Sequence, residues 1–234
     1  MLALEEVDIS YGPAQAIAGV SFKVKKGEIV TLVGVNGAGK STIVNAISGF
    51  LGPTKGTITF DGKNIVGVPP EDIVRLGIVQ VAEGRQLFPE LTVEENLTMG
   101  GYTLSSRLKL AAGFEKVYSI FPLLSERRRS SAQTLSGGQQ QMLAIGRAMM
   151  SNPKMMIFDE PSFGLSPVAA EHTFEVIKGL NESGMPVLLI EQNVPLSLRI
   201  SHFAHVLQKG RIVLSGPSQE VLRNSYIETA YLGL

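Results

Sequence analysis

The sequence of 234 residues contains no cysteine and carries no net charge. Without cysteine, disulfide bonds and cysteine-ligated metal sites are excluded, which suits a reducing compartment. The 21 Lys and Arg residues are balanced by 21 Asp and Glu residues, so no basic excess indicates nucleic acid or an anionic lipid surface as a partner. We therefore expect partners to be recognised at specific sites, with no nucleic acid among them.

Long apolar runs are also absent. The longest, such as MMIF and VLLI, fall far short of the ~18 residues that indicate a membrane span. The opening MLALEEVD turns acidic at once, unlike the basic and then apolar start of a secretory signal. What is present is an apolar content of 44%, which suffices for one substantial core with a small subdomain beside it. We expect a soluble, cytoplasmic protein.

Strand and helix patterns alternate along most of the chain. Apolar periodicity predicts strands at LALEEVD, AIAGVSFKVKKGE, IVTLVG, MMIFDE, PVLLIEQ, FAHVLQK and RIVLSG, and a hairpin at GTITFDGKNI. Helices are predicted from Lys40, between Pro69 and Gly77, and in VAAEHTFEVIKGLNE and SQEVLRN. Between Thr92 and Met150 strand signals nearly vanish, and periodic apolar residues indicate several helices. The pattern predicts an α/β fold with a largely parallel sheet and an inserted helical block.

The sequence GVNGAGKST, residues 34–42, follows a predicted buried strand and precedes a predicted helix. A Gly-x-x-x-x-Gly-Lys-Ser pattern in this context lets backbone N–H groups surround phosphate oxygens at a helix start. Lys40 would reach the β- and γ-phosphates, and the Ser41 hydroxyl would coordinate Mg²⁺. The alternative is an ordinary glycine-rich turn. The candidate phosphate-binding residues are Gly34, Asn36, Gly37, Ala38, Gly39, Lys40, Ser41 and Thr42.

Two carboxylates follow the apolar strand in KMMIFDEPS. Asp159, at the strand end, could hold the magnesium shell, and Glu160, one residue later, could act as the general base that activates water. Alternatively, a strand that ends in Asp-Glu could cap a neighbouring helix. The combination with the phosphate loop favours the catalytic interpretation.

A second candidate anion site begins a helix at Ser136, Gly137, Gly138 and Gln139. The free N–H groups of a helix start and the serine hydroxyl could bind an anion. A capped helix with glycines for tight packing would give the same sequence.

Together, the phosphate loop, the Asp-Glu strand and Leu-Ser-Gly-Gly-Gln resemble the ATP-binding cassette (ABC) ATPases in content and order over nearly the whole chain. The resemblance implies a single ABC ATPase domain over residues 1–234. It would have a mostly parallel core sheet, an N-terminal antiparallel β subdomain and a helical subdomain at about residues 84–150. It also implies ATP and Mg²⁺ as ligands. In this family Ser136 to Gln139 would contact the γ-phosphate held by another subunit, so one chain would form half of a two-site dimer.

Further positions match the family pattern. Tyr11 corresponds to the aromatic residue that stacks on adenine, although an isolated tyrosine could equally pack on the surface. Glu83 occupies a position usually held by Gln, five residues before Phe88, and would contribute to the metal site; the spacing of Gln80 from that Phe excludes it.

Besides Glu83, two more positions depart from the common pattern. Ser166 stands where many members have Asp, and Gln192 where most have a histidine that touches the γ-phosphate. Neither His172, His202 nor His205 falls at that position. We expect Gln192 to sense the γ-phosphate and position water, with Lys40 and Glu160 as the other catalytic residues. A strand-end Gln satisfied by backbone groups is the alternative.

The departures occur together in one branch of the family. The chain is similar here to the shorter ATP-binding subunit of branched-chain amino-acid importers, with urea, amide or other amino-acid importers as the alternative. The segments that carry this similarity are EGR, EPSFGLSP, EQN and the terminal AYLGL. A soluble ABC ATPase is less consistent with the sequence, because no second cassette or coiled-coil insertion is present. A P-loop GTPase would normally show an Asn-Lys-x-Asp guanine signal, which is absent, and a small-molecule kinase would not explain Leu-Ser-Gly-Gly-Gln.

The resemblance also implies the partners. They are a second ABC ATPase subunit, either a related chain or a second copy, two membrane-spanning permease subunits, and indirectly a solute-binding protein. The expected location is therefore the cytoplasmic face of the cell membrane, as a peripheral subunit.

Overall fold

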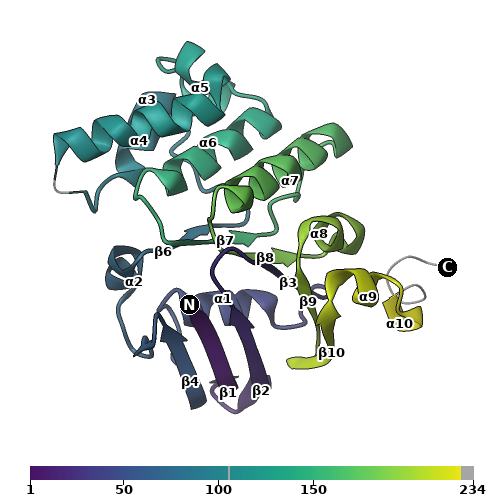
Figure 1. Cartoon of the computed structure of the whole chain (residues 1–234). Helices are drawn as coiled ribbons and strands as arrows, with labels where there is room; N and C mark the ends of the chain where they lie inside the picture. The colour runs from purple at the N-terminus through teal and green to yellow at the C-terminus, as the bar shows by residue number, and fades with distance from the viewer. Residues whose placement is uncertain (105, 228–234) are drawn as a thin grey trace.

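The computed structural model describes residues 1–104 and 106–227, so the terminal AYLGL lies outside the described residues. Strands and helices alternate along the chain (Figure 1). The strands are β1 (Leu2–Tyr11), β2 (Ala14–Val24), β3 (Ile29–Val33), β4 (Lys55–Phe60), β5 (Lys63–Asn64), β6 (Ile78–Val81), β7 (Met155–Asp159), β8 (Val187–Glu191), β9 (Phe203–Gln208) and β10 (Arg211–Pro217). The α-helices are α1 (Lys40–Ile47), α2 (Pro70–Leu76), α3 (Val93–Gly100), α4 (Arg107–Ile120), α5 (Pro122–Glu126), α6 (Gly137–Met149), α7 (Pro167–Glu182), α8 (Val194–Ile200), α9 (Ser218–Leu222) and α10 (Ser225–Ile227), and a 3₁₀ turn, η1, spans Ala132–Thr134.

The strands form two sheets. A four-stranded sheet has the order β2-β1-β4-β5 and is antiparallel. A six-stranded sheet has the order β10-β9-β3-β8-β7-β6, in which neighbours from β9 to β6 are parallel and only β10 pairs antiparallel. The predicted α/β class, with a mostly parallel core sheet and an antiparallel N-terminal sheet, is therefore confirmed.

Helix α1 separates the two sheets (Figure 1). Its buried residues, Ile43 and Ile47 among them, belong to one core cluster that combines residues of β1, β2 and β4 with residues of β3, β7 and β8. A second cluster covers the opposite face of the six-stranded sheet and includes residues of α3, α6 and α7. The two clusters leave the central strands β3, β7 and β8 fully buried, as expected for parallel strands covered on both faces.

The helical part of the chain lies together on that second face. Helices α3 to α6 form a group that lies beside α7 (Figure 1). The helices of this group fall within residues 84–150, the stretch for which a helical subdomain is predicted. Thr92 is the N-cap of α3: its side chain accepts from the Glu95 N–H, and the Glu95 carboxylate accepts from the Thr92 N–H. This reciprocal cap fixes the helix start.

Some elements were not anticipated from the sequence. Strand β6 forms the edge of the six-stranded sheet beside β7, and α8 follows the Gln192 turn with Asn193 as its N-cap. Both are short, with four residues in β6 and seven in α8, so their apolar residues are too few to distinguish one period from another. Within the described residues, no helix is both long and apolar enough to cross a membrane.

One histidine lies in the junction between the sheets. His205 of β9 is only 6% exposed and its ring centroid lies 5.4 Å from that of Phe22 on β2 and 5.1 Å from that of Phe203. Its Nδ1 lies 2.7 Å from the Ser215 hydroxyl. Burial lowers the pKa of His205 from 6.5 to about 4, because an apolar environment disfavours the charged imidazolium.

This pKa predicts an acid-sensitive junction. Between pH 6.5 and 4 the unfolded chain binds a proton at His205 that the folded chain does not, so stability falls as the pH falls through this window. The loss at pH 4 should be about 2 to 3 kcal/mol larger in the parent than in His205→Gln. Urea unfolding at pH 7 and pH 4 measures it, with His172→Gln on the exposed face of α7 as the control. Equal pH dependence in parent and His205→Gln would contradict the assignment.

Candidate functional site

The loop between β3 and α1 has the backbone shape of a phosphate cradle. Gly37 and Gly39 have positive φ angles of 79° and 109°, which glycine adopts without a side-chain penalty. A Cβ on Gly39 would lie 2.5 Å from Ile17, and one on Gly34 would lie 2.5 Å from the Leu207 carbonyl oxygen. The glycines are therefore required both by the turn and by close packing against β2 and β9.

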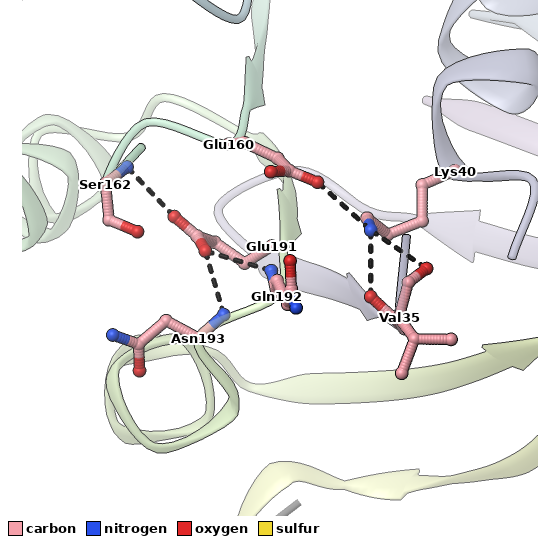
Figure 2. A network of polar contacts seen from close by, with 8 residues as sticks. Val35, Lys40, Glu160, Ser162, Glu191, Gln192 and Asn193 are labelled. Carbon is pink, nitrogen blue, oxygen red and sulfur yellow. Dashed lines mark hydrogen bonds and ion pairs between the residues drawn. The ribbon is translucent and has the colours of Figure 1, made fainter. Parts of the chain in front are cut away.

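Lys40 is the first residue of α1, and its side chain reaches back to this loop. Its side chain is only 4% exposed, and Nζ donates to the carbonyl oxygens of Gly34 at 2.8 Å and Val35 at 3.3 Å. The same ammonium forms an ion pair with Glu160 Oε1 at 3.0 Å (Figure 2). A buried ammonium is stable only with such partners. Lys40 is thus held rigidly between the loop and the Asp-Glu strand.

A cavity of about 540 Å³ lies over the loop. Several residues predicted from the sequence line it: Asn36, Gly37, Gly39, Lys40, Ser41, Thr42, Glu83 and Glu160. Its remaining lining residues, which sequence reasoning did not identify, are Gln15, Ala16, Lys209 and Gly210. Gly34 and Ala38 belong to the loop but do not line the cavity. The Ala38 carbonyl accepts from the Gly210 N–H at 2.8 Å. The cavity is therefore rich in donors, with Glu83 and Glu160 as the acidic groups on its wall.

Asp159 ends β7 beside this cavity and is 6% exposed. Its Oδ2 accepts from Gln80 Nε2 at 3.3 Å, whereas Oδ1 is buried without a hydrogen-bond partner in the described part of the chain. Burial, followed by the charges of Glu160 and Glu83, raises the pKa of Asp159 to about 6. An unpaired carboxylate oxygen of this kind is chemically suited to a hard cation.

Gln80 thus lies behind Asp159 and does not line the cavity, whereas Glu83 does. Ser48 donates to Gln80 Oε1 at 3.1 Å, which orients the amide toward the carboxylate. Within the described residues, no three His, Cys, Asp or Glu side chains form a group that could hold a metal ion. This is compatible with Mg²⁺, which keeps several waters and usually takes one or two carboxylates with substrate phosphates.

Glu160 has an unusual backbone conformation with φ at 46°, a strained geometry for a residue with a side chain. Its N–H donates to the Ile190 carbonyl of β8 at 2.9 Å, and its carbonyl accepts from Phe163 at 3.0 Å. The turn directs the carboxylate toward Lys40 (Figure 2). Strain at such a position is typical of functional sites.

The strand next to β7 ends in a carboxylate that sequence reasoning missed. Glu191 accepts N–H bonds from Ser162, Gln192 and Asn193, each at 3.0 Å. Gln192 itself is exposed and does not line the cavity wall; it lies at the same end of the sheet as Lys40 and Glu160 (Figure 2). The only sequence signal for Glu191 was a charged residue at the end of a buried strand.

The helix start at Ser136 is capped by its own residues. Gln139 N–H donates to Ser136 Oγ at 3.4 Å, and Gln139 Oε1 accepts from the Ser136 N–H at 3.0 Å. Neither Ser136 nor Gly137, Gly138 or Gln139 lines the phosphate cavity. The described chain therefore has two separate candidate anion sites.

Arg85 connects this helix start to the rest of the site. Its guanidinium donates to Gln140 Oε1 at 3.1 Å and to the Gly164 carbonyl at 3.3 Å. Arg147 of α6 donates back to the Arg85 carbonyl at 3.0 Å. Since Arg85 is two residues after Glu83, the cavity wall and the start of α6 are linked through one short segment.

Two other predicted positions lie at the surface. Tyr11, at the end of β1, is 52% exposed and does not line the cavity. Ser166 is the N-cap of α7 and accepts from the Ala169 N–H at 3.4 Å. In this structure each is explained by its local position, and the adenine-stacking role predicted for Tyr11 depends on a bound nucleotide.

Comparison with known sequences points to one family. The sequence model of the family described as ABC transporter matches residues 17–163. BraG of Pseudomonas aeruginosa, described as a high-affinity branched-chain amino acid transport ATP-binding protein, is 46% identical over 233 residues, which cover 100% of both chains. BraF of the same organism, with the same description, is 33% identical and covers 100% of this chain and 98% of its own.

Solved structures agree. An ATP-binding cassette of an ABC transporter in its ADP conformation superposes with a TM-score of 0.87 at 32% identity, covering 100% of this chain and 99% of that one. A cassette solved as a dimer in a post-hydrolysis state with ADP and Pi gives a TM-score of 0.82 at 25% identity, covering 93% and 99%.

The two lysines of the cavity should differ in their contribution to phosphate binding. Lys40→Ala should weaken ATP binding about 100-fold or more, because it removes the ammonium and the two charge-assisted hydrogen bonds that it would donate to phosphate oxygens. Lys209→Ala should weaken it less than about fivefold, because Lys209 is exposed on the cavity rim. Calorimetry on the purified chain measures both. Equal losses would contradict the central position of Lys40.

Proposed function

The chain belongs to the ABC transporter family and is an ATPase, and from this premise we propose that it powers an importer of branched-chain amino acids by hydrolysing ATP over the Gly34–Thr42 loop. The observation that carries the catalytic part of this proposal is the convergence of Lys40 and Glu160 on one cavity. The identity of 46% over the full length to BraG carries the transport part.

The loop residues bind the triphosphate of ATP. The backbone N–H groups of Asn36 to Thr42 and the start of α1 provide donors and positive potential. The Lys40 ammonium contacts Glu160 on one side and the Gly34 carbonyl on the other. It can therefore exchange its contact with Glu160 for one with a phosphate oxygen while the loop still holds it. Tyr11, exposed near the cavity-forming strands, provides a flat ring for adenine.

Ser41, Asp159 and Glu83 are the residues that would hold Mg²⁺, directly or through water. The unpaired Asp159 Oδ1 supports this assignment, and Ser41 and Glu83 line the cavity. When bound, the ion would neutralise developing charge on the phosphate oxygens. Gln80 would keep Asp159 oriented.

Glu160 acts as the general base. Its side chain is 12% exposed at the cavity, so it can accept a proton from a water that attacks the γ-phosphorus while Lys40 holds the phosphate oxygens. Gln192 has an amide that donates and accepts hydrogen bonds but does not titrate, so it serves as a γ-phosphate sensor that positions the water.

Replacing the base should separate binding from chemistry. Glu160→Gln keeps the shape of the side chain, so ATP affinity should change by no more than a few-fold, while turnover should fall by about 10² to 10⁴. Nucleotide binding and steady-state hydrolysis measure the two quantities. A Gln variant that bound no ATP, or hydrolysed it at the parent rate, would refute the role of Glu160.

The second anion site belongs to the nucleotide of a partner chain. Ser136 to Gln139 lie outside the phosphate cavity of their own chain, and a related cassette has been solved as a dimer with ADP and Pi. Two chains placed head to tail would bring each Ser136 helix start against the other chain's cavity. The partner is a related cassette subunit, a choice supported by the two similar proteins BraG and BraF in one organism.

A substitution at the helix start should block closure only. Ser136→Arg places bulk and charge at an exposed position, so ATP should still bind each chain while the ATP-dependent dimer and hydrolysis are lost. Size-exclusion chromatography with ATP in a Glu160→Gln background tests this, with the second cassette subunit present. An ATP-induced dimer that survives the Arg substitution would refute the two-chain site.

An apolar groove offers a docking surface for the permease. A cavity of about 430 Å³ is lined by residues of α2, β6, the segment after Glu83, and the C-terminal ends of α3 and α6. Exposed apolar side chains gather there: Phe88 is 43%, Met99 47% and Tyr102 59% exposed. Arg147 lies 5.6 Å over the Phe88 ring and bonds to Arg85. A short helix from a membrane-spanning permease subunit is the occupant we propose, because the groove adjoins the segment that carries Glu83.

Co-purification tests both the partners and the solute class. From native membranes the chain should bring two permease subunits and a second cassette. Transport assays of that assembly should show leucine, isoleucine or valine uptake; urea or amide uptake would refute the solute.

Met99→Asp should abolish co-purification of the permease subunits but keep ATP binding. Leu108→Asp, at a residue of α4 that is 83% exposed, should leave co-purification intact. Retention of the permeases by Met99→Asp would refute the groove.

A further inference from the structure

Glu191 is a charged side chain in an interior position. It ends β8 with 1% of its surface exposed, and among the described residues it forms no ion pair. On one side it pairs in register with Val33, the residue before the phosphate loop. On the other, Asp159 of β7 pairs with the preceding Ile190. Glu191 therefore lies between the two strands that supply the catalytic loops.

Such a buried carboxylate is costly unless it is well hydrogen-bonded. Three backbone N–H groups meet this requirement: Oε1 accepts from Ser162, and Oε2 accepts from both Gln192 and Asn193 (Figure 2). Burial raises the pKa of Glu191, and these N–H bonds oppose the rise. An ionised carboxylate accepts on both oxygens, whereas an amide of the same shape accepts on only one.

The three N–H groups belong to two catalytic segments. Ser162 lies two residues after Glu160, inside the turn that gives Glu160 its positive φ of 46°. Gln192 and Asn193 form the turn that begins α8. One backbone hydrogen bond, from the Glu160 N–H to the Ile190 carbonyl, already joins the first turn to the end of β8. The Glu191 carboxylate adds a second link, which connects Ser162 to the N–H groups of Gln192 and Asn193.

We infer that Glu191 is a positioning residue for hydrolysis. It fixes the distance between the turn of Glu160 and the turn of Gln192, so that the Glu160 and Gln192 side chains can contact the same water. The inference rests on the roles that the proposed function gives to Glu160 and Gln192. Glu191 does not touch the nucleotide itself, since it does not line the cavity. Glu191 acts by holding Glu160 and Gln192 in position, and small displacements of catalytic groups lower the rate of the chemical step strongly.

The test is the amide variant Glu191→Gln in the full chain, within whichever assembly hydrolyses ATP for the parent. The amide leaves one of the two turns without its acceptor, so kcat should fall at least tenfold, while the dissociation constant for ATP should stay within about threefold and the melting temperature within a few degrees. Glu182→Gln makes the same chemical change at an exposed site at the far end of α7 and should leave all three quantities unchanged.

A loss of less than tenfold in kcat would overturn the inference. So would a joint loss of ATP affinity, melting temperature and kcat, because that pattern marks a merely structural role. If Glu191→Gln does not fold, Glu191→Asp retains the charge with a shorter reach and should show the same selective loss of kcat. A chain that folds with neither variant would also overturn it.

A double-mutant cycle separates positioning from an independent contribution. If Glu191 acts through Gln192, the double variant Glu191→Gln with Gln192→Ala should be no more than about threefold slower than the worse single variant, and losses that multiply would contradict the inference. Glu160→Gln serves as the reference for the proposed function. If that variant hydrolyses at the parent rate, the base assignment fails; if it is slow while Glu191→Gln is not, only the positioning role fails.

Discussion

The buried ammonium of Lys40 is the interaction on which the site depends. It joins the carbonyl oxygens of the loop after β3 to the carboxylate that follows β7. Those elements are neighbours because β8 pairs with both strands in parallel, which brings all three carboxyl ends to one edge of the sheet. The Lys40 ammonium therefore connects the start of α1, the loop after β3 and the Asp-Glu turn around one cavity.

The same geometry limits what one chain can do. The cavity has donors and two carboxylates, Glu83 and Glu160. The helix start at Ser136 does not line it and is linked to it through Arg85, which donates to Gln140 and Gly164. A short segment after β6 thus connects three regions: the cavity wall at Glu83, the start of α6, and the apolar groove around Phe88 and Met99. In the proposed function, this segment would link the nucleotide to the partner cassette and the membrane subunits.

The sequence predicted the fold class well because the central strands are continuous apolar runs and the loop at 34–42 requires its glycines. The family and the ATPase activity are confirmed, while the roles of individual site residues stay predictions. Short elements such as β6 and α8 were missed, since so few residues do not distinguish one apolar period from another. Glu191 and Arg85 were missed for another reason: their importance comes from contacts with residues distant in sequence, and no spacing rule reveals such contacts.

We propose that the phosphate cavity of one chain is completed by the Ser136 helix start of another. A structure of the hydrolysis-deficient assembly bound to ATP and Mg²⁺ tests this directly. We expect the partner's α6 start within hydrogen-bond distance of the γ-phosphate, with Lys40 and Glu160 of the first chain on the other side. A structure in which the γ-phosphate contacts one chain only, with both α6 starts facing solvent, would contradict it.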